Sequence, residues 1–178
     1  AYSNDPRQFI TEIVNETKKI LNSSESVESK SKKIEKIALA TVDIQGIGYY
    51  TLGNYRKSLK SEEEKKEYLK LFKKYFLKSF ISRLTDHSNP KINVLDIQVL
   101  NPKYTIVKSL LVATSERPEV KIDWRVYTND PNNPLIRDLI VEGLSLARTQ
   151  KEEFASIIEA NNGDLSGLFD KLKEFINE

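Results

Sequence analysis

The chain has 178 residues with 28 basic and 26 acidic side chains, a net charge of +2, and no cysteine. This length predicts one domain, residues 1–178, that buries a sizeable core without metals or disulfides. The nearly balanced charge gives no electrostatic argument for nucleic acid, whose binders carry basic patches. The absence of cysteine excludes disulfides, thiolate nucleophiles and cysteine metal ligands. No apolar run approaches the roughly 20 residues that span a bilayer.

The N-terminal part of the chain predicts helices. Asp5 followed by Pro6 indicates a helix start, because proline at the first helical position lacks an amide that has no partner there anyway. Residues 22–33 are polar and predict a loop or frayed turn, since they offer no apolar face to bury. A short helix resumes at Ile34. The segment 41–55 that follows is aromatic and contains glycines.

The longest helix is predicted from about Glu62 to about Leu84. It opens with Ser61 and Glu64, which form a capping box. Its apolar stripe is rich in aromatic residues and predicts core packing, with the alternative that one flank of the stripe is the wall of a ligand site. The stripe contains Tyr68, Leu69, Leu71, Phe72, Tyr75, Phe76, Phe80, Ile81 and Leu84.

After residue 91 the apolar period changes from helical to alternating, which predicts strands. Residues 106–114 are apolar on both faces, so this strand is covered on both sides or faces a cavity. The next strand, centred on Trp124, alternates and buries one face. The fourth strand is expected from Leu135 to Leu146. We therefore predict an α+β fold with an antiparallel sheet of about four strands, N-terminal helices and two C-terminal helices.

The first C-terminal helix is predicted to start near Gln150, because Thr149 and Glu152 form a second capping box. Gly163 lies where a left-handed residue would end that helix. Asp164 is the predicted cap of the last helix.

The residues needed for catalysis are scarce. The single histidine, His87, lies in a polar loop, and no glycine-flanked nucleophile elbow accompanies it. Asp138 and Glu142 lie four apart and offer an acid/base pair. The alternative, which we favour, is that both anchor a polar corner through backbone amides or an arginine, with Arg148 and Arg56 as candidate partners.

Three segments in a fixed order carry a resemblance to a known family. The first is TLGNYRK at residues 51–57, the second is the aromatic helix KEYLKLFKKYFLKSF at 66–80, and the third is DLIVEGLSLARTQKEEFASII at 138–158. Together they resemble the MlaC family, the periplasmic phospholipid-binding shuttles of the Mla pathway. The resemblance covers about Asp5 to Phe175 and departs from the family in residues 22–33 and 130–134.

The resemblance implies a carrier that holds phospholipid tails in an apolar cavity and leaves the headgroup in solvent. It implies two docking partners, an outer-membrane lipoprotein complex and an inner-membrane ABC transporter complex with an MCE protein. It also implies a periplasmic location, outer-membrane lipid asymmetry as the process served, a monomer, no catalytic activity, and no metal or cofactor besides bound lipid. The chain starts at Ala1 without a methionine, which fits removal of a signal peptide and fits a cloning boundary equally well.

Exposing acyl chains to water is costly, which explains the need for a carrier. At roughly 0.8 kcal/mol per methylene, some thirty methylenes cost on the order of 20 kcal/mol. A cavity for them needs aliphatic and aromatic walls with few polar groups. The candidate lipid-binding residues are Tyr50, Leu52, Phe72, Phe76, Phe80, Val107, Leu111, Ile122, Trp124, Val126, Leu139, Ile140 and Leu144.

Three other functions remain open from the residues alone. The same cavity would suit another apolar small molecule. A small-molecule enzyme would use Asp138 or Glu142 in an α+β pocket. An adaptor that stimulates a transporter would hold no ligand and would have a dry core.

Overall fold

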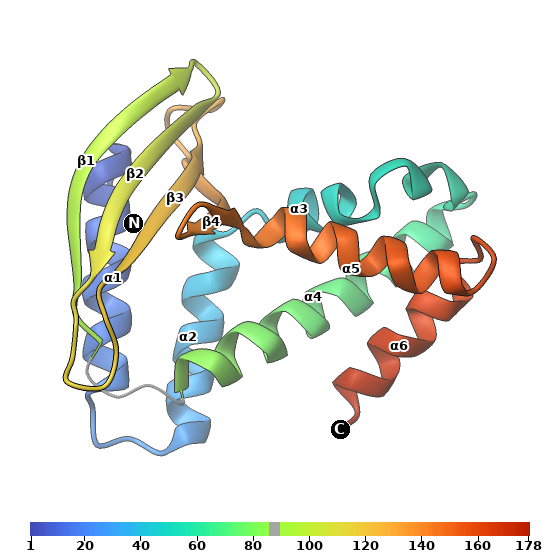
Figure 1. Cartoon of the computed structure of the whole chain (residues 1–178), viewed down its shortest axis with the longest axis horizontal. Coiled ribbons are helices and arrows are strands. Elements are labelled where there is room, and N and C mark those ends of the chain that lie inside the picture. Colours follow the sequence, from blue (N-terminus) through green and yellow to red (C-terminus); the bar gives the residue numbers. More distant parts are fainter. Residues whose placement is uncertain (86–89) are drawn as a thin grey trace. The chain divides into compact units, whose positions relative to one another are not determined.

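The computed structural model describes residues 1–85 and 90–178 and confirms the predicted α+β class (Figure 1). Its helical elements are α1 (Pro6–Leu21), α2 (Val27–Thr41), α3 (Ile44–Leu52), η1 (Gly53–Ser58), α4 (Glu62–Thr85), α5 (Leu146–Ala160) and α6 (Ser166–Ile176). Its strands are β1 (Ile92–Asn101), β2 (Tyr104–Leu111), β3 (Val120–Tyr127), β4 (Leu135–Val141) and β5 (Leu144–Ser145). The sheet is antiparallel with the order β1-β2-β3-β4-β5, one strand more than predicted. The predicted loop residue His87 lies outside the described residues.

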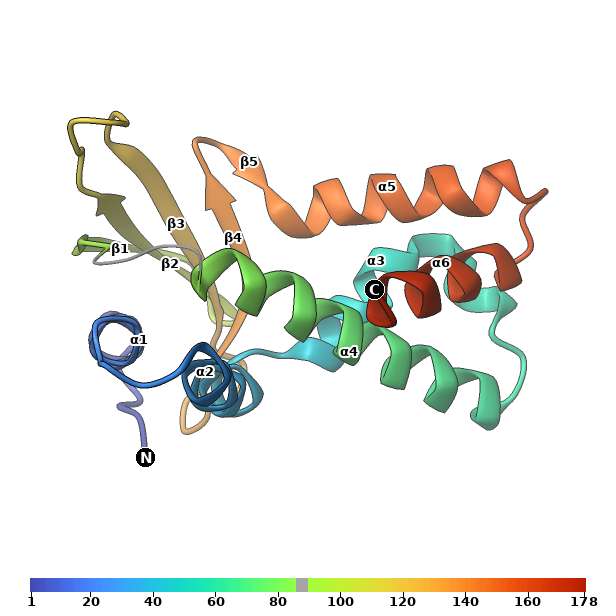
Figure 2. The same cartoon turned by 90° about the horizontal axis from the view of Figure 1, so that it is seen from below.

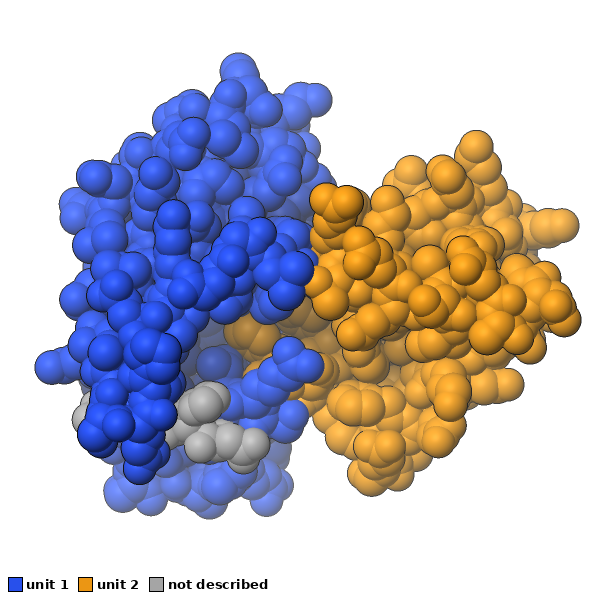
Figure 3. Space-filling model, in the orientation of Figure 1, with its two compact units in different colours: residues 1–43, 81–146 blue, residues 44–80, 147–178 orange. Residues whose placement is uncertain are grey.

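The chain divides into two compact units, which are coloured separately in Figure 3. Unit 1 contains Ala1–Asp43 and Ile81–Leu146, and therefore the first two helices and the sheet. Unit 2 contains Ile44–Phe80 and Ala147–Glu178, and is helical throughout. The chain passes between the units three times, once within helix α4 and once directly after the first residue of α5. Our expectation of a single domain stays a prediction.

Unit 1 builds its core between one face of the sheet and the helices α1 and α2, which lie on the same side of the strands (Figure 2). In antiparallel strands, residues directly opposite each other share a face. Val107 pairs with Trp124, and Trp124 pairs with Leu139, so these three side chains face the helices. The core cluster consists of Phe9, Ile10, Ile13, Val14, Ile37, Val107, Trp124, Val126 and Ile136.

The start of α1 is as predicted, whereas the predicted loop over residues 22–33 is wrong in its second half. The Asp5 side chain accepts a hydrogen bond from the Gln8 amide at 3.0 Å and caps α1. Helix α2 begins at Val27, where the Ser26 hydroxyl accepts from the Ser29 amide at 3.1 Å. Apart from the exposed Val27, its first two turns are polar, and its buried residues begin only at Ile34. A helix whose apolar face starts late gives no periodic signal at its beginning.

The predicted fourth strand from Leu135 to Leu146 is also wrong at its end, because the chain reverses after Val141. Glu142 has φ 49° and Gly143 has φ 81°, and Val141 pairs with Leu144 across them. Two consecutive residues with positive φ between paired strands are the two-residue hairpin loop of the I′ type. The turn therefore separates β4 from the short β5.

Helix α4 changes the face that it buries along its length. Its predicted start is confirmed, since the Ser61 hydroxyl accepts from the Glu64 amide at 3.1 Å. Tyr68 and Phe72 are 0% and 1% exposed in its first half, while Leu77 and Ile81 are buried further on. Each of these later residues comes nine positions after one of the first pair, which is about 180° around a helix.

The C-terminal helices follow the predicted signals only in part. Helix α5 begins at Leu146, directly after β5, so the predicted start near Gln150 is one turn late. Gly163 has φ 80° after the end of α5, which confirms its predicted left-handed conformation. The Asp164 carboxylate accepts from the Ser166 amide at 2.9 Å and satisfies an amide at the start of α6.

Candidate functional site

The thirteen candidate lipid-binding residues divide between the two units. Unit 2 contributes Tyr50, Leu52, Phe72, Phe76 and Phe80, all on helices α3 and α4. Unit 1 contributes Val107, Leu111, Ile122, Trp124, Val126, Leu139, Ile140 and Leu144, all on strands.

Five of the thirteen side chains are fully packed. Val107, Trp124 and Val126 belong to the core cluster of unit 1 and contact the first two helices. The Trp124 indole N–H donates to the Ser109 hydroxyl at 2.9 Å, so the polar atom of this ring is also satisfied by protein. The other two, Leu52 on α3 and Phe72 on α4, are at most 2% exposed. These residues shape the scaffold in the described conformation.

The remaining strand candidates are more accessible. Ile122 and Leu139 are half-buried at the border of the unit 1 core cluster, on the face that carries the helices. Ile140 pairs with Asp123 and therefore lies on the opposite face of the sheet. Leu144 is 58% exposed beside the β4–β5 turn. The alternation predicted for these strands is thus correct, and it distributes the candidates over both faces.

Helix α4 carries a ladder of aromatic rings inside unit 2. Phe72 contacts Phe76 with ring centroids 6.0 Å apart, and Phe76 stacks on Phe80 at 5.7 Å with an interplanar angle of 8°. The ladder runs from fully buried rings to half-buried ones, since Phe76 and Phe80 keep part of their surface accessible. Of the candidate rings in the ladder on α4, these two therefore have the most apolar surface left to offer a ligand. Tyr50 is 43% exposed, with the Lys151 ammonium 5.2 Å from its ring centroid.

The buried end of this ladder is fixed by a polar contact. The Tyr68 hydroxyl donates to the Gly48 carbonyl at 2.9 Å and lies 2.9 Å from the Thr51 hydroxyl. Burial raises the pKa of the Tyr68 phenol well above its usual range, and the hydrogen bond with Thr51 offsets only part of this effect. The phenol is therefore neutral, and it ties α4 to α3 within unit 2.

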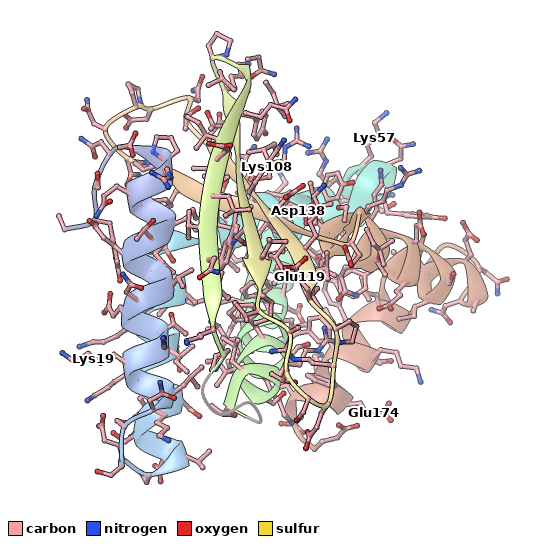
Figure 4. All side chains as sticks on the ribbon, turned by 60° about the vertical axis from the view of Figure 1, so that its left-hand side comes forward. Lys19, Lys57, Lys108, Glu119, Asp138 and Glu174 are labelled. Atoms are coloured by element: carbon pink, nitrogen blue, oxygen red, sulfur yellow. The ribbon has the colours of Figure 1, made fainter. Side chains whose placement is uncertain are left out.

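Asp138 and Glu142 both belong to the β4–β5 hairpin, Asp138 on strand β4 and Glu142 in the turn. Asp138, labelled in Figure 4, accepts a hydrogen bond from the Ser145 hydroxyl across the β4–β5 hairpin. Glu142 is exposed in the turn itself, and its amide donates to the Lys121 carbonyl at 2.9 Å. Arg148 forms an ion pair with Glu152 at 3.4 Å. The contact between Asp138 and Ser145 fits the interpretation that Asp138 fastens the corner.

A cluster of arginines and tyrosines in unit 1 was not predicted from the sequence. Arg137 forms a 2.8 Å ion pair with Asp43, donates to the Tyr104 hydroxyl at 2.7 Å, and lies 3.9 Å above the ring centroid of Tyr127. Burial lowers the pKa of the Arg137 guanidinium, but the bonds to Asp43 and Tyr104 outweigh it and raise that pKa. The Asp43 amide also donates to the Ile136 carbonyl at 3.0 Å. The cluster therefore fixes the last residue of the N-terminal segment of unit 1 to strand β4.

No contact in this cluster had a sequence signal. Asp43 and Arg137 are 94 positions apart, and neither stands in a motif. Only the alternation around Trp124 suggested that Tyr127 shares a face with Arg125.

The described residues give no support for a metal centre or a membrane span. Residues 1–85 and 90–178 contain no group of three or more histidine or acidic side chains that would hold a metal ion. No helix in these ranges is both long and apolar enough to cross a bilayer. A groove of about 480 Å³ between α1 and β1 has a mixed lining that includes Asp5, Arg7 and Asn93, unlike the apolar wall that acyl chains need.

Comparisons with known proteins agree with the resemblance found in the sequence. A family model described as MlaC protein matches residues 11–174. A search of curated protein sequences finds no match. Among solved structures, the fold is similar to that of a phospholipid-binding protein from Ralstonia solanacearum in complex with a phospholipid, with a TM-score of 0.78. That protein is 17% identical in sequence, and the alignment covers 94% of each chain.

Proposed function

Because the chain belongs to the MlaC family, we propose that it is a phospholipid carrier that holds acyl tails against apolar side chains. The observation that carries this proposal is the family match, which extends over residues 11–174 and so includes nearly every element of both units. The fold likeness to a protein solved with a phospholipid supports it. The chemistry is binding and release, and it needs neither a metal nor a catalytic residue.

The proposed contacts to the acyl tails come from apolar side chains that the protein itself leaves partly accessible. In unit 2, Phe76 and Phe80 offer stacked rings on α4. In unit 1, Ile122 and Leu139 offer aliphatic groups on the face of the sheet that carries the helices. Each methylene that such side chains remove from water contributes roughly 0.8 kcal/mol. Because acyl tails form no directional bonds, we expect weak selectivity for the headgroup.

We further propose that the carrier moves phospholipid across the periplasm. Its partners would be an outer-membrane lipoprotein complex and an inner-membrane ABC transporter complex with an MCE protein. Family membership supports these partners and a monomeric state, and the energy for directional transport would come from ATP hydrolysis by the transporter. Asp138 would then act as a fastener of the β4–β5 corner.

The proposal is tested by transfer of labelled phospholipid from vesicles to the purified protein. We expect uptake by the natural chain and a strong loss in the double variant Phe76→Asp, Phe80→Asp, because two carboxylates would lie against the tails. Leu39→Asp is the matched control, since Leu39 is an exposed apolar residue on α2 at 44% exposure. Absence of uptake by the folded natural chain contradicts the proposal, as does equal uptake by the natural chain and the double variant.

A further inference from the structure

Helix α4 carries a concentration of positive charge over most of its length. Residues 65–80 contain six lysines and one acidic residue, Glu67, in a chain whose net charge is only +2. Two of the lysines are used inside unit 2. Lys65 forms an ion pair with Glu62 at 3.2 Å, and Lys78 donates to the Phe175 carbonyl at 2.6 Å, at the end of α6.

The other four, Lys66, Lys70, Lys73 and Lys74, form what we call the lysine stripe. Their spacing places them on one side of α4, opposite the buried Tyr68. All four are exposed, and none has an acidic partner within 4.0 Å in the described ranges 1–85 and 90–178. The stripe extends over nine residues, or about 12 Å of helix.

A shallow groove of about 290 Å³ lies beside the stripe. Lys70 and Lys74 line it from α4, and Lys173 lines it from α6. Glu67 is the only acidic residue in its lining, and this carboxylate lies 3.4 Å from the Lys173 ammonium. The groove therefore carries two lysines in excess and adds to the positive potential of the stripe.

The chemistry of the stripe favours a diffuse negative surface as its partner. Lysine is a point charge on a flexible stem, whereas arginine is the residue that binds carboxylates in a fixed forked geometry, and the stripe has no arginine. A specific protein interface also needs a buried aromatic or apolar anchor. No large hydrophobic side chain is exposed among the described residues between Tyr50 and Leu95.

We propose that the lysine stripe is the surface with which this carrier lies on a bilayer containing anionic phospholipid. Lysines near such a surface attract it without inserting, so the contact is reversible and weakens with salt. The inference rests on the proposed function for its biological sense, because a carrier must approach the membrane with which it exchanges lipid. Glu62 and Glu63 bound the stripe at the start of α4 and limit its length in that direction.

The test is co-flotation of the full chain with vesicles of phosphatidylcholine alone or of phosphatidylcholine mixed with phosphatidylglycerol. We expect association with the anionic vesicles only, lost at high salt. Lys70→Glu with Lys74→Glu should weaken this association by roughly tenfold or more, and Lys70→Gln with Lys74→Gln by less. The matched control is Lys36→Glu with Lys103→Glu, which changes the net charge equally at two exposed lysines of unit 1. Circular dichroism checks that each variant is folded.

Three results overturn the inference. They are equal association with both kinds of vesicle, equal loss in the control variant, and binding of a poly-glutamate peptide to the stripe without association with anionic vesicles. Native mass spectrometry of the same samples separates this inference from the proposed function. A chain that carries phospholipid but does not associate with anionic vesicles contradicts only the inference about the lysine stripe. A chain that binds these vesicles through the stripe but carries no phospholipid contradicts only the proposed function.

Discussion

The two units of this protein build their cores from different side chains. Unit 1 packs mainly aliphatic residues, with Phe9 and the single tryptophan, between a sheet and two helices. Unit 2 packs rings against rings on helices, with Phe72 in contact with Tyr68, Tyr75, Phe76 and Phe154. Aliphatic side chains interlock on a pleated surface, whereas rings give a helix large apolar area at few positions. The difference explains how unit 2 keeps partly accessible rings at the end of a rigid stack.

The largest expected effect comes from truncating one fully buried side chain in the core of each unit. Phe72→Ala should lower the free energy of unfolding by about 3 to 5 kcal/mol and Ile10→Ala by about 2 to 5 kcal/mol, because both side chains are at most 1% exposed. Trp124 lies in unit 1, so urea unfolding followed by tryptophan fluorescence reports on that unit, while circular dichroism follows all helices. We expect Ile10→Ala to shift the fluorescence transition more than Phe72→Ala does. Equal shifts of both signals in both variants contradict the separation of the cores.

A smaller effect is expected where the ring stack of unit 2 meets a glycine. A Cβ atom at Gly48 would lie 2.9 Å from Cδ2 of the Phe72 ring. The ring is packed on several sides and has little room to yield, so Gly48→Ala should destabilise the protein by about 1 to 3 kcal/mol. Thermal unfolding measures this change. Gly143→Ala is not a suitable control because of its positive φ, so Ser156→Ala on the exposed side of α5 serves instead, and an equal effect of both changes counts against tight packing at Gly48.

In unit 1 the next effect concerns the ion pair between Arg137 and Asp43. Arg137→Ala should cost about 1 to 2 kcal/mol, between the values for exposed and buried ion pairs, because the Arg137 and Asp43 side chains are 30% and 18% exposed. Chemical denaturation measures the loss. Arg125→Ala is the matched control, since the Arg125 guanidinium lies 4.2 Å above the ring centroid of Tyr104 and forms no ion pair among the described residues. A larger loss in the control would show that stacking, rather than the pair with Asp43, holds the cluster together.

The smallest expected effect concerns the buried phenol of unit 2. Tyr68→Phe removes the hydrogen bonds of the phenol with the Gly48 carbonyl and the Thr51 hydroxyl and should cost about 1 kcal/mol at neutral pH, because Thr51 still donates to the Gly48 carbonyl. Since the folded-state pKa of Tyr68 is raised, the stability it contributes is complete below its unfolded pKa of about 10 and is lost as pH rises above it. The difference in stability between the natural chain and the variant should therefore shrink above that pH. Melting temperatures of both proteins, measured as a function of pH, follow this difference. A gap that widens instead contradicts burial of a neutral phenol.

The capping signals were correct for two helices. Asp5 and Ser61 were recognised as caps, because capping depends on residues within a few positions of one another. The predicted cap at Thr149 is wrong, since α5 begins at Leu146, and Leu165 rather than Asp164 is the N-cap residue of α6. The first turns of α2 and the β4–β5 turn were not recognised. The former has no buried residue before Ile34, and in the latter a non-glycine residue, Glu142, adopts positive φ beside Gly143.

The sequence predicted which residue types form the candidate site better than it predicted which of their side chains are accessible. Alternation identified Trp124 and Val126 as inward-facing, yet only tertiary packing shows that helices α1 and α2 occupy that face. The ion pair between Asp43 and Arg137 joins residues 94 positions apart, and no local pattern encodes such a contact. The lysine stripe was not predicted, because which lysines of α4 lack partners depends on where Glu62 and the α6 carbonyls lie.

Native mass spectrometry of the purified chain after incubation with phospholipid vesicles tests the central claim most directly. The account predicts a folded species heavier than the chain by the mass of a bound phospholipid, and its disappearance in the Phe76→Asp, Phe80→Asp variant. A folded chain that shows only its own mass, or a bound molecule whose mass belongs to another class, would contradict the account.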